Sequence, residues 1–205
     1  MPSVIKTLTS VAICTFALAA CQTKPPISNV PQKSGPKAEY NNPPVGTTFT
    51  ILNEQYRVTK SEDAHLSLQA PGGASVDLYA GVIRFWNRDE RVFEASSFTD
   101  LWPIQVGNQA QEVVRVKNGR ISWRYNVAVV GREMIEVPAG NFDSYVIKVH
   151  QQSSTRAYEG VSTYWVSTKL GFPVKREHKH IRGSSAPKDF ELQNYKFPKD
   201  AQPEA

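Results

Sequence analysis

The feature that most constrains the fold of this chain is a strict alternation of apolar residues with polar or small residues near its middle. The apolar members of the pattern are Ile121, Trp123, Tyr125, Val127 and Val129. Because successive side chains of a strand point to opposite faces, this period of two predicts a strand with one buried face and one exposed face. A helix would instead repeat its apolar positions every three or four residues.

Comparable runs occur along the chain and predict further strands. Three pairs of runs are separated by the turn segments Asn118-Gly119, Pro138 to Asn141 and Leu170 to Phe172, and this arrangement predicts hairpins. The pairs are 111–116 with 121–129, 134–137 with 144–150, and 163–166 with 173–181. Earlier runs of the same character lie at 47–52, 56–59, 65–69 and 76–86.

Regular short strands with frequent turn signals are typical of antiparallel sheets. We therefore predict a mainly β fold, with a single curved antiparallel sheet that forms an open half-barrel or a sandwich. Little helix is expected beyond the N-terminal signal. One short turn is predicted at 96–102, where Phe98, Leu101 and Trp102 can pack as a plug before Pro103 ends it.

Composition divides the chain into four parts. Residues 1–20 form an apolar leader, and residues 21–44 are rich in Pro, Lys, Ser and Asn, which predicts a disordered tether. Residues 45–198 have the size of one domain with a single core. The short end at 199–205 contains acidic residues and Pro and is predicted to be a disordered tail.

The leader is built like an export signal. Lys6 precedes an uncharged run from Leu8 to Ala19, which is too short for a permanent membrane helix. The sequence Leu18-Ala19-Ala20-Cys21 follows, and it resembles the lipobox of bacterial lipoproteins. The resemblance implies that Cys21 carries diacylglycerol and an N-linked acyl chain such as palmitate, and that it begins the mature protein. An ordinary secretory signal and a cytosolic protein with an apolar start remain the alternatives.

A lipidated Cys21 predicts a protein anchored in the cell envelope. Each buried methylene contributes about 0.8 kcal/mol, so two or three acyl chains hold a protein on the membrane stably. Gln22 stands where enteric bacteria use aspartate to retain lipoproteins in the inner membrane. In an organism that has an outer membrane, the expected location is therefore that membrane, with the domain facing the periplasm. Cys14 lies in the leader, so the mature chain has no second cysteine for a disulfide.

The charge is too small and too dispersed for a nucleic-acid binder. The 205 residues carry a net charge of +5, and removal of the leader takes away Lys6 and leaves +4. Nucleic-acid binding requires basic residues concentrated on one surface. The partners expected are the membrane, through the lipid anchor, and an envelope protein or an apolar ligand.

One segment does concentrate positive charge. Lys175, Arg176, Lys179 and Arg182 surround two histidines within a predicted strand. Such a strand can contact lipid phosphates or another anionic surface of the envelope. The alternative is a solvated edge strand that its lysines protect from aggregation.

Four tryptophans provide a second candidate surface. Trp86, Trp102, Trp123 and Trp165 lie in or beside predicted strands, where aromatic residues usually belong to the core. An incompletely closed sheet could instead present them on a concave face that holds an apolar ligand. Whether this aromatic set is a filled core or a pocket is open at this stage.

No residue pattern specifies a reaction. The chain has no nucleophile elbow, no zinc-protease motif and no phosphate-binding glycine loop, so no catalytic residue is predicted. His178 and His180 share the spacing of some metal sites. A third ligand would have to come from His65, from His150 or from a carboxylate elsewhere, so neither a metal nor a cofactor is predicted.

Three motifs resemble those of uncharacterised bacterial envelope proteins. They are Leu101-Trp102-Pro103-Ile104-Gln105-Val106-Gly107-Asn108, Val137-Pro138-Ala139-Gly140-Asn141-Phe142-Asp143-Ser144-Tyr145 and Tyr164-Trp165-Val166-Ser167-Thr168-Lys169-Leu170-Gly171-Phe172-Pro173-Val174-Lys175. The resemblance implies a curved antiparallel β domain, similar to the half-barrels of lipoprotein carriers and receptors. Val166 and Thr168 depart from the pattern, which has tyrosine and proline there.

These observations together favour a non-enzymatic binding or structural module of the envelope, anchored to the membrane through its lipid. A hydrolase that acts on cell-wall or lipid substrates is the alternative of a different class. A cleft that gathers a histidine with a carboxylate would favour the hydrolase.

Overall fold

The computed structural model describes residues 27, 29–86, 91–92, 96–116, 121–153, 155, 157–183 and 187–201. The predicted leader and Cys21 lie outside these ranges, as do the Asn118-Gly119 turn and residues 202–205. Trp86 is described for its backbone alone.

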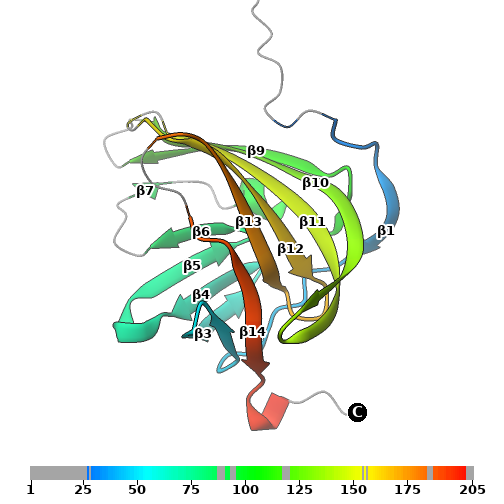
Figure 1. Ribbon diagram of the computed structural model, residues 1–205, viewed down its shortest axis with the longest axis vertical. Coiled ribbons are helices and arrows are strands. Elements are labelled where there is room, and N and C mark those ends of the chain that lie inside the picture. The colour runs from blue at the N-terminus through cyan, green and yellow to red at the C-terminus, as the bar shows by residue number, and fades with distance from the viewer. Residues whose placement is uncertain are drawn as a thin grey trace, which may run out of the picture.

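The strands of the described ranges form one long antiparallel sheet and a separate two-stranded ribbon. Twelve strands follow one another in the order β6-β5-β4-β3-β2-β14-β13-β12-β11-β10-β9-β7, and β1 pairs with β8 outside this sheet. The long sheet curls into a half-barrel (Figure 1). The predicted fold class, mainly β with a curved antiparallel sheet, is confirmed.

The half-barrel has two parts, built from the first and second halves of the chain. The first part contains β2 (Thr48–Ile51), β3 (Glu54–Glu62), β4 (His65–Gln69), β5 (Ser75–Tyr79) and β6 (Ile83–Trp86), with the 3-10 turn η1 at Pro71–Gly73. The second part contains β9 (Gln109–Val116), β10 (Ile121–Val137), β11 (Gly140–Ser153), β12 (Glu159–Ser167) and β13 (Phe172–Arg182), with β7 (Arg91–Val92) at its edge.

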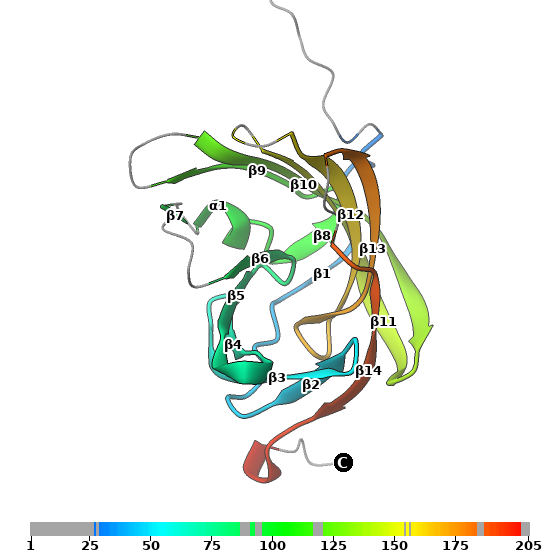
Figure 2. The same cartoon turned by 60° about the vertical axis from the view of Figure 1, so that its left-hand side comes forward.

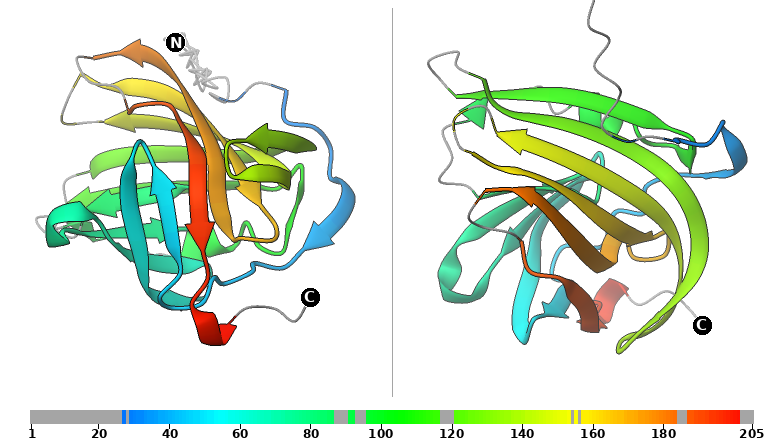
Figure 3. Two further views of the ribbon diagram at one scale, coloured as in Figure 1. Left: turned by 60° about the horizontal axis from the view of Figure 1, so that its bottom comes forward. Right: turned by 45° about the horizontal axis from the view of Figure 1, so that its top comes forward.

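One late strand joins the two parts. β14 (Phe190–Lys196) pairs with β13 only at its start, where Phe190 lies opposite Arg176, and then pairs along its length with β2. It crosses the seam between the two parts, as the left view of Figure 3 shows. The 3-10 turn η2 (Lys199–Ala201) follows it.

The predicted hairpins are confirmed, with two differences in the strands. β9 pairs with β10, β10 with β11 and β12 with β13, each antiparallel. The runs predicted at 121–129 and 134–137 belong to one strand, β10, which bends at an irregularity between Val129 and Gly131. The run predicted at 76–86 is instead the hairpin β5–β6, because Ala80 and Gly81 adopt φ of 51° and 76° and reverse the chain.

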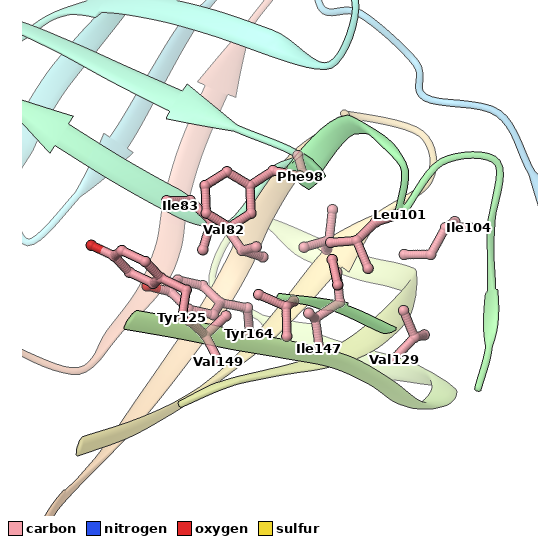
Figure 4. Packing of buried hydrophobic residues seen from close by; sticks show 14 of the residues in the cluster. Val82, Ile83, Phe98, Leu101, Ile104, Tyr125, Val129, Ile147, Val149 and Tyr164 are labelled. Carbon is pink, nitrogen blue, oxygen red and sulfur yellow. The ribbon is translucent and has the colours of Figure 1, made fainter. Parts of the chain in front are cut away.

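The concave side of the sheet is filled by a short plug. α1 (Ser96–Thr99) and the residues after it lie within the curl of the sheet (Figure 2), and Phe98, Leu101 and Ile104 are fully buried. They pack against inward-facing side chains of β10 to β12, including Val129 and Ile147 (Figure 4). The predicted plug at 96–102 is therefore present, and it occupies the centre of the concave face.

The described part of the predicted tether differs from the expectation of disorder. Within residues 29–44, β1 (Ser34–Ala38) pairs with β8 (Ile104–Val106) along the outer side of the molecule (Figure 1). We call residues 29–44 the N-terminal strap. Its polar, Pro-rich composition does not prevent packing, because the domain supplies hydrogen-bond partners: Tyr145 donates to the carbonyl of Pro36 at 2.7 Å.

An aromatic side chain fastens the end of the strap. Tyr40 packs edge-to-face against Trp102, with ring centroids 4.8 Å apart, and its hydroxyl donates to the carbonyl of Gly171. Burial raises the pKa of the Tyr40 hydroxyl, so it remains a neutral donor.

The helical segments of the described ranges are α1 and two 3-10 turns, and each falls far short of the length and apolarity needed to cross a membrane.

Candidate functional site

A cleft of about 570 Å³ opens on the concave side, between the two parts of the half-barrel. Its walls come from the β2–β3 turn and the start of β3, from β6 and the turn before it, from β10 to β13, and from the segment that leads into β14. The lining residues are Leu52, Glu54, Tyr56, Val82, Ile83, Arg84, Tyr125, Val149, Gln151, Ser162, Tyr164, Arg176, Pro187 and Lys188. The cleft therefore combines charged, hydroxyl and aliphatic groups from segments distant in the sequence.

Below the cleft lies a much smaller apolar cavity of about 30 Å³. It continues among core residues such as Leu68 and Phe172. The residues that it shares with the cleft are Tyr56, Val82, Arg84, Tyr164 and Arg176. Among the described residues, this cavity offers far less space than the cleft above it.

Arg176 reaches the cleft from β13. In antiparallel pairs, residues directly opposite one another lie on the same face. Arg176 lies opposite Tyr164, whose ring belongs to the core, so Arg176 also points inward, and it is only 7% exposed. Its Nε donates to the carbonyl of Lys188 at 3.1 Å, and its guanidinium lies 4.9 Å from the centroid of the Phe190 ring.

Arg84 approaches the same space from β6, on the other part of the half-barrel. Its Nη2 donates to the hydroxyl of Tyr56 at 3.4 Å, and the guanidinium lies 5.5 Å from the centroid of that ring. The Tyr56 hydroxyl donates in turn to Oε2 of Glu54 at 2.8 Å. Burial, and then the hydrogen bond to Glu54, raise the pKa of the Tyr56 hydroxyl.

A serine and a histidine lie side by side next to Arg176. Ser162 Oγ is 2.8 Å from Nδ1 of His178, and the other ring nitrogen, Nε2, is 3.4 Å from the hydroxyl of Tyr158. Burial, followed by the positive charges of Arg176 and His180, lowers the pKa of His178. The Asp189 carboxylate accepts a hydrogen bond from the backbone N–H of His178.

The four basic residues predicted to form one anionic-surface contact do not share a face. Lys175 lies opposite Trp165, Lys179 opposite Val161 and Arg182 opposite Glu159, all on the outer face of the sheet, whereas Arg176 points inward. The sequence spacing already separates Arg176 from Lys175 and Lys179, because neighbouring strand positions alternate between faces.

Two of the outer cations have carboxylate partners. Lys175 Nζ lies 3.0 Å from Oε1 of Glu177, and Arg182 Nη2 lies 3.4 Å from Oε2 of Glu159. A contact of Lys175, Lys179 and Arg182 with an anionic surface stays a prediction.

The described tryptophans do not all lie on the concave side of the sheet. Trp165 is on the outer face of β12, where its Nε1 donates to Glu133 at 2.6 Å and Lys175 lies 5.2 Å from its ring. Trp102 packs under the strap, and Trp123 contacts Tyr158 with ring centroids 5.5 Å apart. The cleft is lined by none of these three described side chains, so they do not form one concave ligand face. The side chain of Trp86 lies outside the described residues.

The one buried histidine of the described residues, His150, is on the opposite side of the sheet from the cleft. His150 alternates with the inward-facing Val149, and its Nε2 lies 2.9 Å from Oε1 of Glu159. Within the described ranges, no group of three His, Cys, Asp or Glu side chains is placed to hold a metal ion.

Sequence reasoning missed most of the cleft. No sequence motif marks Tyr56, Arg84 or Ser162 as a site residue. Each lies in or beside a predicted strand, and they come together only because the two parts of the half-barrel meet. Arg176 was singled out, but as one member of a surface cluster. Its alternation with Lys175 was the available hint that it faces the other way.

Comparisons with known proteins give distant structural likenesses. No protein-family model matches the chain, and no curated protein matches its sequence. The hypothetical lipoprotein YmcC of Escherichia coli (K12) aligns with a TM-score of 0.47 at 12% identity, over 74% of this chain and 84% of that one.

Two further solved structures align similarly. A candidate lipoprotein of Parabacteroides distasonis aligns with a TM-score of 0.37 at 14% identity, over 79% of this chain and 100% of that one. A candidate exported protein of Bacteroides fragilis with a YmcC-like fold aligns with a TM-score of 0.42 at 14% identity, over 78% and 99%. None of the three descriptions gives an activity.

Proposed function

We propose that this protein is a lipid-anchored binding module of the cell envelope, and that the cleft between the two parts of its half-barrel is the ligand site. The observation that carries the proposal is the cleft of about 570 Å³, which both parts of the sheet line with convergent polar groups. Small-molecule sites are typically concave, of about 300 to 1,000 Å³, with a few placed polar groups among apolar walls.

The anchoring part of the proposal rests on the sequence. The leader and the segment Leu18-Ala19-Ala20-Cys21 resemble those of bacterial lipoproteins. A lipid on Cys21 would hold the domain at a membrane of the envelope, and Gln22 favours the outer membrane, facing the periplasm.

The filled interior narrows the choice among ligands. The plug residues Phe98 and Leu101 are fully buried where a carrier would need space for an acyl chain. The ligand is therefore a small molecule, or a small exposed group of a larger one, that enters the cleft from its open side.

The hydrolase alternative has one observation in its favour, the 2.8 Å contact between Ser162 and His178 beside the cleft. A catalytic pair of this kind normally has a third group that orients the imidazole, most often a carboxylate. Here the second ring nitrogen faces the Tyr158 hydroxyl, and Asp189 contacts the backbone of His178 and not its ring. The pair is better explained as a cross-strand hydrogen bond, because Ser162 and His178 are directly opposite in the β12–β13 register.

A fluorophosphonate probe separates the two functions. We expect Ser162 to stay unlabelled in the purified full-length protein. Labelling that disappears in Ser162→Ala and in His178→Gln would establish the hydrolase and contradict a purely binding role.

The cleft itself is tested by photo-crosslinking in cells that produce the full-length protein. A photoreactive phenylalanine analogue replaces Leu52, which lines the cleft and is 43% exposed, or Met134, which is 67% exposed on β10 and does not line the cleft. We expect a small-molecule adduct of defined mass at position 52 alone. No adduct at 52, or the same adduct at both positions, would refute the assignment of the cleft as the ligand site.

A further inference from the structure

We propose that the cleft binds a small organic anion, whose carboxylate or phosphate oxygens contact Arg176 and Arg84 while a short apolar portion lies against the aliphatic wall. The inference rests on the proposed function, since it names the ligand class of the same cleft.

The charges that line the cleft are mostly positive. Arg84, Arg176 and Lys188 are the cations among the lining residues, and Glu54 is the single carboxylate of the described lining. The two guanidiniums come from β6 and β13, on opposite parts of the half-barrel. Guanidinium groups are well suited to this role, because their planar fork of N–H donors matches the oxygens of carboxylate and phosphate.

Arg176 is distinguished by burial without a negative partner. Other cations of the described chain, such as Arg132, Lys175 and Arg182, lie within 4.0 Å of a carboxylate. For Arg176, which is 7% exposed, no carboxylate of the described residues comes that close, and its contacts are a carbonyl and an aromatic ring. Burial of a cation without an anion is costly, and a bound anion would offset that cost.

The surroundings of Arg176 reflect the same positive field. The charge of Arg176 contributes, after burial, to the lowered pKa of His178. The groups that face His178 are Ser162, Tyr158 and His180, with the Asp189 carboxylate at its backbone. An anion near Arg176 would reduce this field.

The other lining residues indicate the chemistry of the rest of the ligand, beyond its anionic group. Tyr125, Gln151 and Ser162 supply hydroxyl and amide groups, and the Gln151 amide already donates to the Tyr125 hydroxyl at 3.0 Å. Val82, Ile83 and Val149 give an apolar wall. The ligand class is therefore an anion that also carries a few apolar carbon atoms, and not a bare inorganic ion.

Isothermal titration calorimetry with a matched series of probes tests this class. The full-length lipidated protein, in a non-ionic detergent, is titrated with hexanoate, hexyl phosphate, hexan-1-ol, hexylammonium and inorganic phosphate. We expect one or both six-carbon anions to bind at least about tenfold more tightly than the alcohol and the ammonium compound, because hydrogen bonds to charged groups are the stronger ones. Inorganic phosphate should bind more weakly than hexyl phosphate.

A pair of variants on the same strand locates the binding. Arg176→Gln should weaken anion binding about tenfold or more, whereas Lys179→Gln, which removes the same charge from the outer face of β13, should leave it unchanged. Circular dichroism shows whether Arg176→Gln folds. If it does not, the ligand class is still tested by the comparison of probes on the unaltered protein and by the Arg84→Gln variant.

One further probe identifies the source of the anion. Dihexanoyl phosphatidylglycerol that binds more tightly than hexyl phosphate would indicate an anionic lipid headgroup, and the reverse order would indicate a soluble metabolite. The inference is wrong if neither six-carbon anion binds, if hexan-1-ol binds as tightly as the anions, or if Lys179→Gln weakens binding as much as Arg176→Gln. A photo-adduct at position 52 alone would, in those cases, still support the cleft as a ligand site, so the two failures are distinguishable.

Discussion

Arg176 and His178 lie two positions apart on β13, and this spacing turns both side chains towards the concave side of the sheet. Their proximity couples a permanent cation to a group that titrates near neutral pH. Anion binding in the cleft should therefore be reported by the protonation of this histidine.

We predict a pKa for His178 below the ordinary value of 6.5. Burial and the charge of Arg176 are the leading causes, so Arg176→Gln should move the pKa back towards 6.5 while Lys179→Gln should not. NMR titration of the ring Cε1–H signal measures the three values. A pKa at or above 6.5 in the unaltered protein would contradict this description of the cleft.

The lowered pKa of His178 also determines the direction in which the free energy of unfolding changes with pH. His178 is harder to protonate in the folded state than in the unfolded chain, so its contribution to stability is complete above the unfolded pKa. It is lost as the pH falls through about 6.5 towards the lower folded value. Arg176→Gln should make the loss of stability that comes from His178 on acidification smaller.

At the scale of elements, two glycines of the domain allow the backbone of the N-terminal strap to approach closely. A Cβ at Gly171 would lie 1.8 Å from the backbone oxygen of Asn41, and one at Gly107 would lie 2.7 Å from the backbone nitrogen of Lys33. These two positions admit the strap because they carry no side chain.

We predict that Gly171→Ala destabilises the protein more than Gly72→Ala. Both glycines have positive φ, 57° and 76°, but a Cβ at Gly72 would meet no atom within 4 Å. The conformational cost alone should be about 1 kcal/mol, as for Gly72→Ala, and displacement of the strap should raise the cost at Gly171 to about 2 to 4 kcal/mol. Urea denaturation followed by tryptophan fluorescence gives both values, and equal losses would show that the strap is not tightly docked.

The plug that fills the concave face gives a further prediction. Leu101 is fully buried beside α1, so Leu101→Ala should lower the free energy of unfolding by about 2 to 5 kcal/mol. Leu52→Ala, at the exposed rim of the cleft, should change it by less than about 1 kcal/mol. Similar losses for the two variants in urea denaturation would contradict a tightly packed plug.

How much of these elements could be predicted depends on how local their signals are. The hairpins were predictable because Pro138, Gly140 and Gly171 mark turns between alternating runs. The β5–β6 hairpin was missed because Ala80 adopts a positive φ, which the residue type alanine does not predict. The strap was missed because its order comes from long-range partners, such as Tyr145 with Pro36, which composition does not reveal.

The candidate site was less predictable for the same reason. Arg84 and Arg176 are 92 positions apart in the sequence and line one cleft only because β14 joins the two parts of the half-barrel. Period-two alternation tells which residues share a face of a strand, but it does not tell which face remains open after the plug packs.

For the whole molecule, the strap changes the expected geometry of anchoring. The predicted tether of residues 21–44 shortens to the six steps between Cys21 and Ile27, because Ile27 is buried and β1 of the strap pairs with β8. At about 3.6 Å per residue, these steps span roughly 22 Å at most. A lipid on Cys21 would therefore keep Ile27 within roughly this distance of the membrane surface.

The anchor itself is tested by one substitution. Cys21→Ser should move the protein from the membrane fraction to the soluble fraction, because the acyl chains are the predicted attachment. The fold should be unchanged by circular dichroism. Retention of the variant in washed membranes would show that something other than a lipid on Cys21 holds the protein there.

The central claim, an anion held in the cleft, is tested most directly by native mass spectrometry of the protein extracted from cells in a mild non-ionic detergent. We predict one bound small molecule on the unaltered protein and on Lys179→Gln, and its loss from Arg176→Gln. An unaltered protein with no bound species, or the same species on all three proteins, would contradict the claim.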